Sequence, residues 1–119
     1  MATILVVDDD AAVGAIIQQH LTETGHRVFV ARGTTDALAA LTTRPSLDLM
    51  IVDLVMPEGQ PDGLTFATEA LARMPNVPVI FLIAYYGFVA RSGPLPGAIM
   101  YKPVDLDVLT REINGVLAQ

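Results

Sequence analysis

Three aspartates and a lysine stand at the ends of short apolar runs, where their types suit metal and phosphoryl chemistry. Asp8 and Asp9 follow the run 4–7, Asp53 ends a second run, and Lys102 ends a third. Carboxylates within a few ångströms of one another repel, so a proton or a cation must bind there. Hard oxygen ligands suit Mg²⁺, and a lysine beside them neutralises a phosphoryl group as a point charge. These residues predict a metal-assisted phosphoryl acceptor with an aspartate as nucleophile.

Apolar runs alternate with helical patterns along the chain, and this alternation must position the four residues. Strands are predicted at 4–7, 27–31, 49–53, 77–83 and 99–101. Helices are predicted between Asp10, as a cap, and Gly25, as a stop, and at 35–41, 64–74 and 105–117, the last capped by Asp105. Uniformly apolar runs are typical of parallel strands that helices cover on both faces.

Five β/α units predict an α/β fold with a doubly wound parallel sheet. For a chain of 119 residues, read as a single domain over 1–119, we expect the flavodoxin-like strand order 2-1-3-4-5. The first and third strands are then neighbours, so Asp8 and Asp53 should meet at one edge of the sheet. Lys102, after the fifth strand, should lie on the same edge.

Residues 85–97 interrupt the alternation where a fourth helix would be expected. Gly87, Gly93, Pro94, Pro96 and Gly97 all fall within this segment. Glycine and proline disfavour a helix interior. The fourth helix is therefore predicted to be weak or missing.

The motifs resemble those of the response-regulator receiver domain of two-component signalling, over essentially the whole chain. The resemblance rests on the run Asp8-Asp9-Asp10, on Asp53-Leu54-Val55-Met56-Pro57 followed by Asp62-Gly63-Leu64, and on Tyr101-Lys102-Pro103. It implies that Asp53 accepts a phosphoryl group from a phosphohistidine on a sensor histidine kinase or phosphotransfer protein. It also implies Mg²⁺ held by Asp9, Asp53 and the Val55 backbone carbonyl, with Asp8 acting through water.

The resemblance further implies that Lys102 and the backbone amide of Ala84 contact the phosphoryl oxygens. The family has threonine or serine where Ile83 stands, and an aromatic switch residue where Ile99 stands. Tyr101 is the nearby aromatic residue, and it should share a strand face with Ile99. We therefore expect the phosphorylation chemistry to persist and the usual means of transmitting it to be absent. Such a domain is a phosphoryl acceptor, with autodephosphorylation at most, and not a turnover enzyme.

Two further departures from the family concern partners. The link 58–61 is longer than usual, which predicts either a tolerated surface insertion, the interpretation we favour, or altered access for the kinase. The segment 85–97 is shorter than usual. Apolar side chains in the shorter segment either fold back onto the sheet or form a patch for a partner. We favour a patch for a downstream protein or for a second copy of the chain, within Tyr85–Tyr101.

The composition excludes several other functions. Thirteen acidic residues against seven basic ones argue against direct nucleic-acid binding. The chain has no cysteine, which excludes disulfides and thiol chemistry and fits a cytoplasmic location. The longest apolar stretch falls short of the roughly 20 residues that a membrane span requires.

Two alternatives remain open from the sequence. The loss of a hydroxyl at Ile83 favours a degenerate receiver that acts as a phosphorylation-independent interaction module. Asp8-Asp9-Asp10 also fits the Asp-x-Asp motif of haloacid-dehalogenase-type phosphatases, although Ala12 stands where that motif has threonine or valine.

Overall fold

The computed structural model describes residues 1–43, 46–84 and 94–118, which contain a five-stranded parallel sheet. Its order is β2-β1-β3-β4-β5, which confirms the predicted fold and topology. The strands are β1 (Thr3–Val7), β2 (Arg27–Ala31), β3 (Leu49–Asp53), β4 (Val79–Ile83) and β5 (Ala98–Tyr101). The helices of the described residues are α1 (Ala11–Glu23), α2 (Thr34–Thr43), α3 (Gly63–Arg73) and α5 (Leu106–Leu117).

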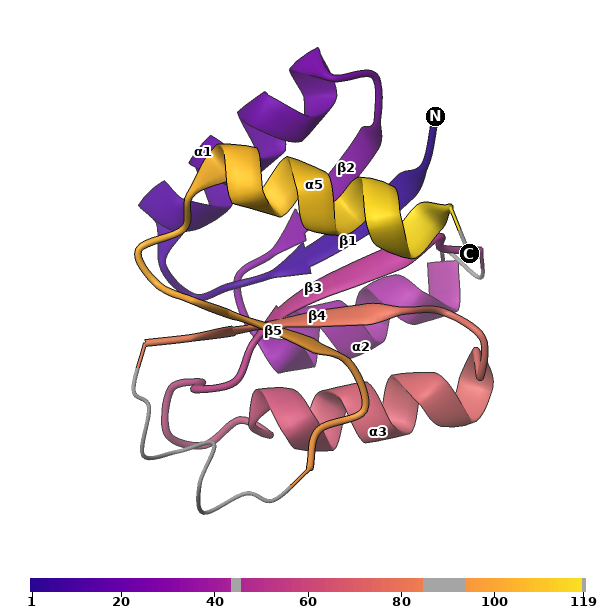
Figure 1. The fold of residues 1–119 in the computed structure, drawn as a ribbon. Coiled ribbons are helices and arrows are strands. Elements are labelled where there is room, and N and C mark those ends of the chain that lie inside the picture. Colours follow the sequence, from indigo (N-terminus) through magenta and orange to yellow (C-terminus); the bar gives the residue numbers. More distant parts are fainter. Residues whose placement is uncertain (44–45, 85–93, 119) are drawn as a thin grey trace.

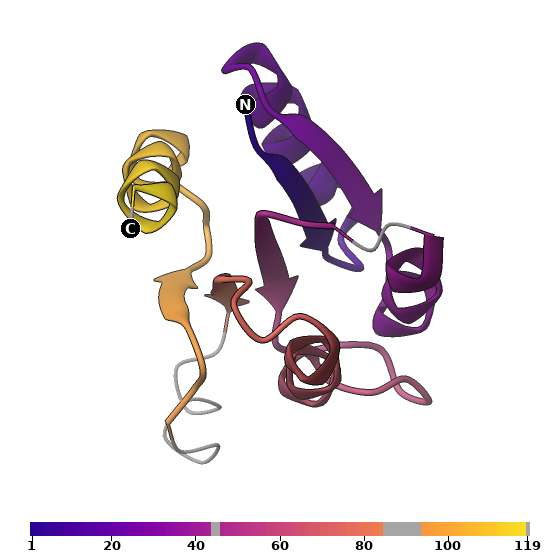
Figure 2. The same cartoon turned by 90° about the vertical axis from the view of Figure 1, so that its right-hand side faces the viewer.

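The sheet separates two layers of helices, with α1 and α5 on one face and α2 and α3 on the other (Figures 1 and 2). Because strand side chains alternate between faces, the core consists of two clusters. The cluster under α1 and α5 contains Val6, Ile51 and Leu82 among its buried residues. The cluster under α2 and α3 contains Val52 and Phe81.

The helix ends follow from local side chains. Asp10 caps α1 by accepting hydrogen bonds at Oδ1 from the Ala12 and Val13 amides, at 3.0 and 3.2 Å. Asp105 caps α5 in the same way, as predicted from the sequence. Gly25 follows α1 with a positive φ of 97°, which suits a glycine at the end of a helix.

Several predicted bounds differ from the structure by one or two residues, including those of the fourth strand and the second helix. The strand predicted to begin at residue 77 begins at Val79, because the preceding Pro78 has no amide proton to donate. The fourth strand is thus shorter than its apolar run. The helix predicted over 35–41 is longer and spans Thr34–Thr43.

Part of the predicted output region lies outside the described residues. The expectation of a weak or missing fourth helix, and the apolar residues Tyr85, Tyr86, Phe88 and Val89, fall within 85–93. Beyond that segment, Leu95 packs against the cluster under α2 and α3. Within the part of the chain that the structure describes, no helix is both long and apolar enough to span a bilayer.

Candidate phosphoryl and metal site

Strand alternation directs three predicted site residues toward the same face of the sheet. Asp8, Asp53 and Lys102 each lie two positions after a residue of the core cluster under α1 and α5. Backbone hydrogen bonds extend the sheet through two of them. The Asp8 amide donates to the Ala31 carbonyl at 3.1 Å, and the Lys102 amide donates to the Ile83 carbonyl at 2.9 Å. The parallel sheet thus gathers residues far apart in sequence at the carboxyl ends of β1, β3 and β5.

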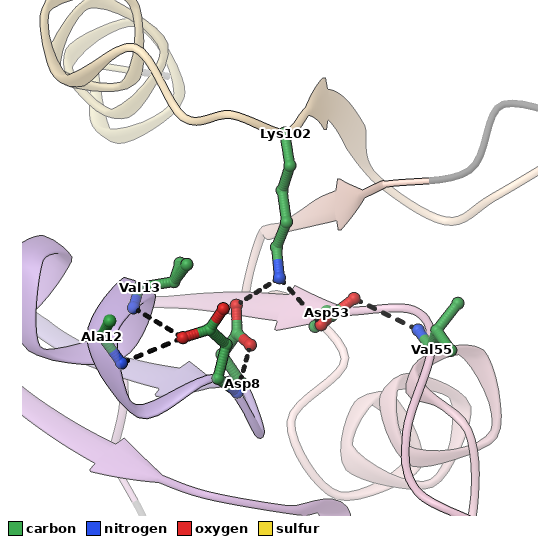
Figure 3. Close-up of polar contacts among 7 residues, drawn as sticks. Asp8, Ala12, Val13, Asp53, Val55 and Lys102 are labelled. Carbon is green, nitrogen blue, oxygen red and sulfur yellow. Dashed lines mark hydrogen bonds and ion pairs between the residues drawn. The ribbon is translucent and has the colours of Figure 1, made fainter.

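The lysine ammonium bridges two buried carboxylates (Figure 3). Lys102 Nζ lies 2.9 Å from Asp8 Oδ2 and 3.0 Å from Asp53 Oδ2. Asp8 is fully buried, and Asp53 is 5% exposed. Asp9 is exposed, and one carboxylate oxygen of each aspartate lies within 4.8 Å of the others. The structure therefore brings together the four residues that the sequence singled out.

Backbone amides hold the two buried carboxylates in place. Asp53 Oδ1 accepts a hydrogen bond from the Val55 amide at 3.2 Å, and Asp8 Oδ1 accepts one from the Asp10 amide at 2.9 Å. Asp8 Oδ2, in contrast, accepts no aligned hydrogen bond from the described residues, although Lys102 is in ion-pair contact. A buried carboxylate oxygen with unused lone pairs is costly unless a cation or water satisfies it.

The pKa values of the site reflect burial and the closeness of the charged side chains. Burial raises the pKa of the Asp53 carboxyl above 3.8, the Asp8 charge raises it further, and the hydrogen bond from Lys102 partly opposes both. For Lys102, burial lowers the pKa of the ammonium, but contacts with Asp8 and Asp53 outweigh it and raise the pKa above 10.5. Three carboxylates facing one ammonium leave negative charge uncompensated. The residues present therefore fit a hard divalent cation such as Mg²⁺.

The predicted switch positions lie on the other face of the sheet. Ile83 is fully buried in the core cluster under α2 and α3, and Ile99 packs against that cluster. Tyr101 pairs with Ile83 in the β4–β5 register and is 47% exposed. Ala84 follows β4 directly and is exposed at the carboxyl edge of the sheet. Apolar packing therefore occupies the positions where the family has its hydroxyl and aromatic switch residues.

Some features of the site were not predictable from the motifs alone. The link 58–61 is anchored to α2, because Thr34 Oγ1 donates a 2.6 Å hydrogen bond to the Pro61 carbonyl. The Lys102–Pro103 peptide bond is cis. Asp62 caps α3 by accepting from the Thr65 amide at 2.8 Å, which the position of an aspartate just before a helical pattern could have indicated.

Comparison with known proteins decides the family. The model of the response regulator receiver domain matches residues 4–114. The chain belongs to this family. Receiver domains of two-component response regulators interact with sensor kinases or phosphotransfer proteins, and they generally bind Mg²⁺ at an acidic pocket.

Individual relatives agree with this assignment. The chain is 33% identical, over 99% of its length, to the transcriptional regulatory protein GlrR of Escherichia coli strain K12, and it spans 27% of that protein. A receiver domain protein from Clostridium thermocellum has 28% identity and a TM-score of 0.84, covering 99% of this chain and 95% of that one. The response regulator TrrA from Thermotoga maritima, in complex with Mg²⁺ and BeF, has 26% identity and a TM-score of 0.85, covering 98% and 99%.

Proposed function

We propose that this receiver domain is a phosphoacceptor that takes a phosphoryl group onto Asp53. The observation that carries the proposal is the Lys102 ammonium, which lies between the buried carboxylates of Asp8 and Asp53, with Asp9 within reach of both. A single ammonium does not neutralise three carboxylates, so the site favours a divalent cation and then a phosphoryl group. The family assignment favours this function over the phosphatase alternative.

Mg²⁺ would be held by Asp9, Asp53 and the Val55 backbone carbonyl, with Asp8 acting through water. When bound, the ion would neutralise the carboxylates and the oxygens of the incoming phosphoryl group. Asp8 Oδ2 contacts the Lys102 ammonium at 2.9 Å but accepts no aligned hydrogen bond from the described residues, which supports a role for Asp8 through water. The complex of TrrA with Mg²⁺ and BeF gives further support from a relative of the same fold.

The transfer step needs little covalent chemistry from the protein. A carboxylate oxygen of Asp53 attacks the phosphorus of a phosphohistidine, a phosphorus–oxygen bond forms and the phosphorus–nitrogen bond breaks. The imidazole nitrogen leaves with the electron pair and takes up a proton from water. Lys102 would then contact a phosphoryl oxygen, and the Ala84 amide would donate to another.

The partners follow from this chemistry. The donor would be a sensor histidine kinase or a phosphotransfer protein, and both would meet the chain in the cytoplasm. The output would pass by contact with a downstream protein or with a second copy of the chain, through the region 85–101. GlrR is a transcriptional regulatory protein, and this chain spans 27% of it. Direct nucleic-acid binding is not proposed for this chain, because its net charge is negative.

Beryllofluoride, an acyl-phosphate mimic, tests the proposal. With Mg²⁺ present, we expect it to shift the amide resonances of Asp53, Ala84 and Lys102 in an NMR titration. Asp48→Asn, at the opposite end of β3, should leave these shifts unchanged. If millimolar Mg²⁺ and beryllofluoride shift none of them, the chain is a degenerate receiver that acts independently of phosphorylation.

A further inference from the structure

The loop that follows Asp53 is attached at its far end to the start of α2. Its base is closed by a 2.8 Å hydrogen bond from the Gly63 amide to the Leu54 carbonyl. Its tip is a tight turn, in which the Gln60 amide donates to the Pro57 carbonyl at 3.3 Å and Gly59 has a φ of 89°. Positive φ at the third residue of such a turn favours glycine. We define residues 54–63 as the β3–α3 loop.

The turn presents Gln60 to a helix start that lacks a capping side chain of its own. Gly33 immediately precedes α2, and its carbonyl accepts a hydrogen bond from the Ala37 amide at 3.0 Å. Glycine has no side-chain oxygen to satisfy the free amides of the first turn. Gln60 Oε1 accepts from the Thr35 amide at 3.4 Å instead, so the β3–α3 loop supplies the cap.

Gly33 and Gln60 fit one another sterically. A Cβ added at Gly33 would overlap Gln60 Oε1, and it would lie 3.0 Å from Cδ and Nε2. Next to this contact, the buried Thr34 hydroxyl donates to the Pro61 carbonyl at 2.6 Å. Two successive residues of the loop are therefore hydrogen-bonded to the first turn of α2.

We propose that Gln60 and Thr34 are positioning residues for the metal site. They anchor the β3–α3 loop on α2 and so restrict the backbone of Val55, whose carbonyl is a proposed Mg²⁺ ligand. The inference rests on the proposed function. A ligand that is already ordered costs less conformational entropy when the ion binds. Loosening the anchor should weaken Mg²⁺ binding and leave Asp8, Asp9 and Asp53 in place.

The test compares Mg²⁺ affinity, measured by amide shifts of the labelled chain, between Gln60→Ala and a matched control. Gln19→Ala removes an exposed glutamine of α1 that contacts Glu23. We expect Gln60→Ala to weaken Mg²⁺ binding by roughly two- to tenfold, the equivalent of one neutral hydrogen bond, and Gln19→Ala to leave it unchanged. Labelling by acetyl phosphate should need more Mg²⁺ but reach the wild-type rate at saturation.

Two further variants separate positioning from general destabilisation. Gly33→Ala should displace the Gln60 side chain and mimic Gln60→Ala, and the double variant should bind Mg²⁺ no more weakly than Gly33→Ala alone. Gln60→Glu keeps an acceptor oxygen and should restore much of the affinity, whereas Gln60→Met should not. In the metal-free chain, Gln60→Ala should also speed hydrogen exchange at the Thr35 amide.

The outcomes are distinguishable. If Gln60→Ala lowers the melting temperature but binds Mg²⁺ as tightly as Gln19→Ala, the positioning role is wrong and the contact is only structural. If the wild-type chain binds Mg²⁺ but takes up no phosphoryl group, the phosphoacceptor function fails while the positioning of the metal site stands. If the wild-type chain binds no Mg²⁺, both proposals fail.

Discussion

The side chains at the carboxyl ends of the strands differ between the two faces of the sheet. On the face covered by α1 and α5, the last side chains are Asp8, Asp53 and Lys102, which form a buried ion-pair network. On the face covered by α2 and α3, Ile83 and Ile99 pack into an apolar core. One sheet edge thus combines a cluster of charged side chains with apolar packing at the family's switch positions.

The residues proposed to bind the phosphoryl group and the family's switch positions therefore lie on opposite faces of the sheet in this chain. The ion-pair network depends on charge, on the adjacency of β1 and β3, and on the β4–β5 pairing that places Lys102. Ile83 takes part in that pairing through its backbone, and its side chain packs on the opposite face. A phosphoryl group on Asp53 would find no side-chain hydroxyl at Ile83 to attract. We therefore expect any conformational response to begin at Lys102 and the β3–α3 loop.

The largest effect should come from removing the nucleophile on the charged face. Asp53→Asn should abolish phosphoryl incorporation from acetyl phosphate, measured by intact-protein mass, because an amide oxygen is a poor nucleophile. Asp48→Asn serves as the control at the other end of β3. Continued labelling of Asp53→Asn would place the acceptor on another aspartate.

Removing the cation of the same network should have the next largest effect. Lys102→Met leaves two buried carboxylates facing each other and should lower the free energy of unfolding by about 1–3 kcal/mol in EDTA at neutral pH, below the full cost for a deeply buried pair. The expected loss is smaller than for a fully buried pair because the lysine side chain is 17% exposed. Urea unfolding measures the loss, and Mg²⁺ should recover part of it.

Arg111→Met, on the exposed surface of α5, is the control for that substitution. It should change the free energy of unfolding little, with or without Mg²⁺. If Lys102→Met and Arg111→Met lower the free energy of unfolding equally, Lys102 does not stabilise the fold through its ion pairs with Asp8 and Asp53.

The pH dependence of stability should come from the charged face. Because the Asp53 pKa is raised above 3.8, the folded metal-free chain binds that proton more tightly than the unfolded chain. This contribution to the free energy of unfolding is fully present below pH 3.8 and is lost as pH rises through the folded pKa. Asp53→Asn should remove it, as urea unfolding across the acidic range would show. An unchanged profile would contradict the assignment.

The smallest effect should come from the apolar face. Ile83→Thr adds a hydroxyl at the family's usual position and should strengthen binding of beryllofluoride by about two- to fivefold, through one hydrogen bond to a charged group. Ile83→Val controls for the lost volume. Equal affinities for the two variants would show that a hydroxyl cannot reach the site from this face.

Local sequence patterns were sufficient for much of the fold. The apolar runs identified all five strands, and Asp10 and Asp105 marked the starts of two helices because an aspartate cap acts within three residues. Pro78 shows the limit of such patterns. Its apolar neighbours extend the predicted strand, but proline has no amide proton, so the strand begins at Val79.

Residue types and strand order together predicted which groups would meet at the site. Asp8, Asp53 and Lys102 each lie at the carboxyl end of a strand, so the parallel topology was enough to place them at one edge. Their geometry was not predictable, because the Lys102 contacts depend on the pairing of β4 with β5. The burial of the Asp8 carboxylate, whose Oδ2 contacts Lys102 without an aligned hydrogen bond, was likewise not predictable, because several elements cover it.

By itself, the sequence determined the fold class, the family motifs and the residues that carry the charge, because these depend on short-range patterns and on side-chain chemistry. Only the tertiary structure decided that the charged residues and Ile83 face opposite sides of the sheet. It alone showed that Gln60 reaches the start of α2, 25 residues away in the chain. Contacts of that kind depend on how loops from separate β/α units pack together, which no local pattern records.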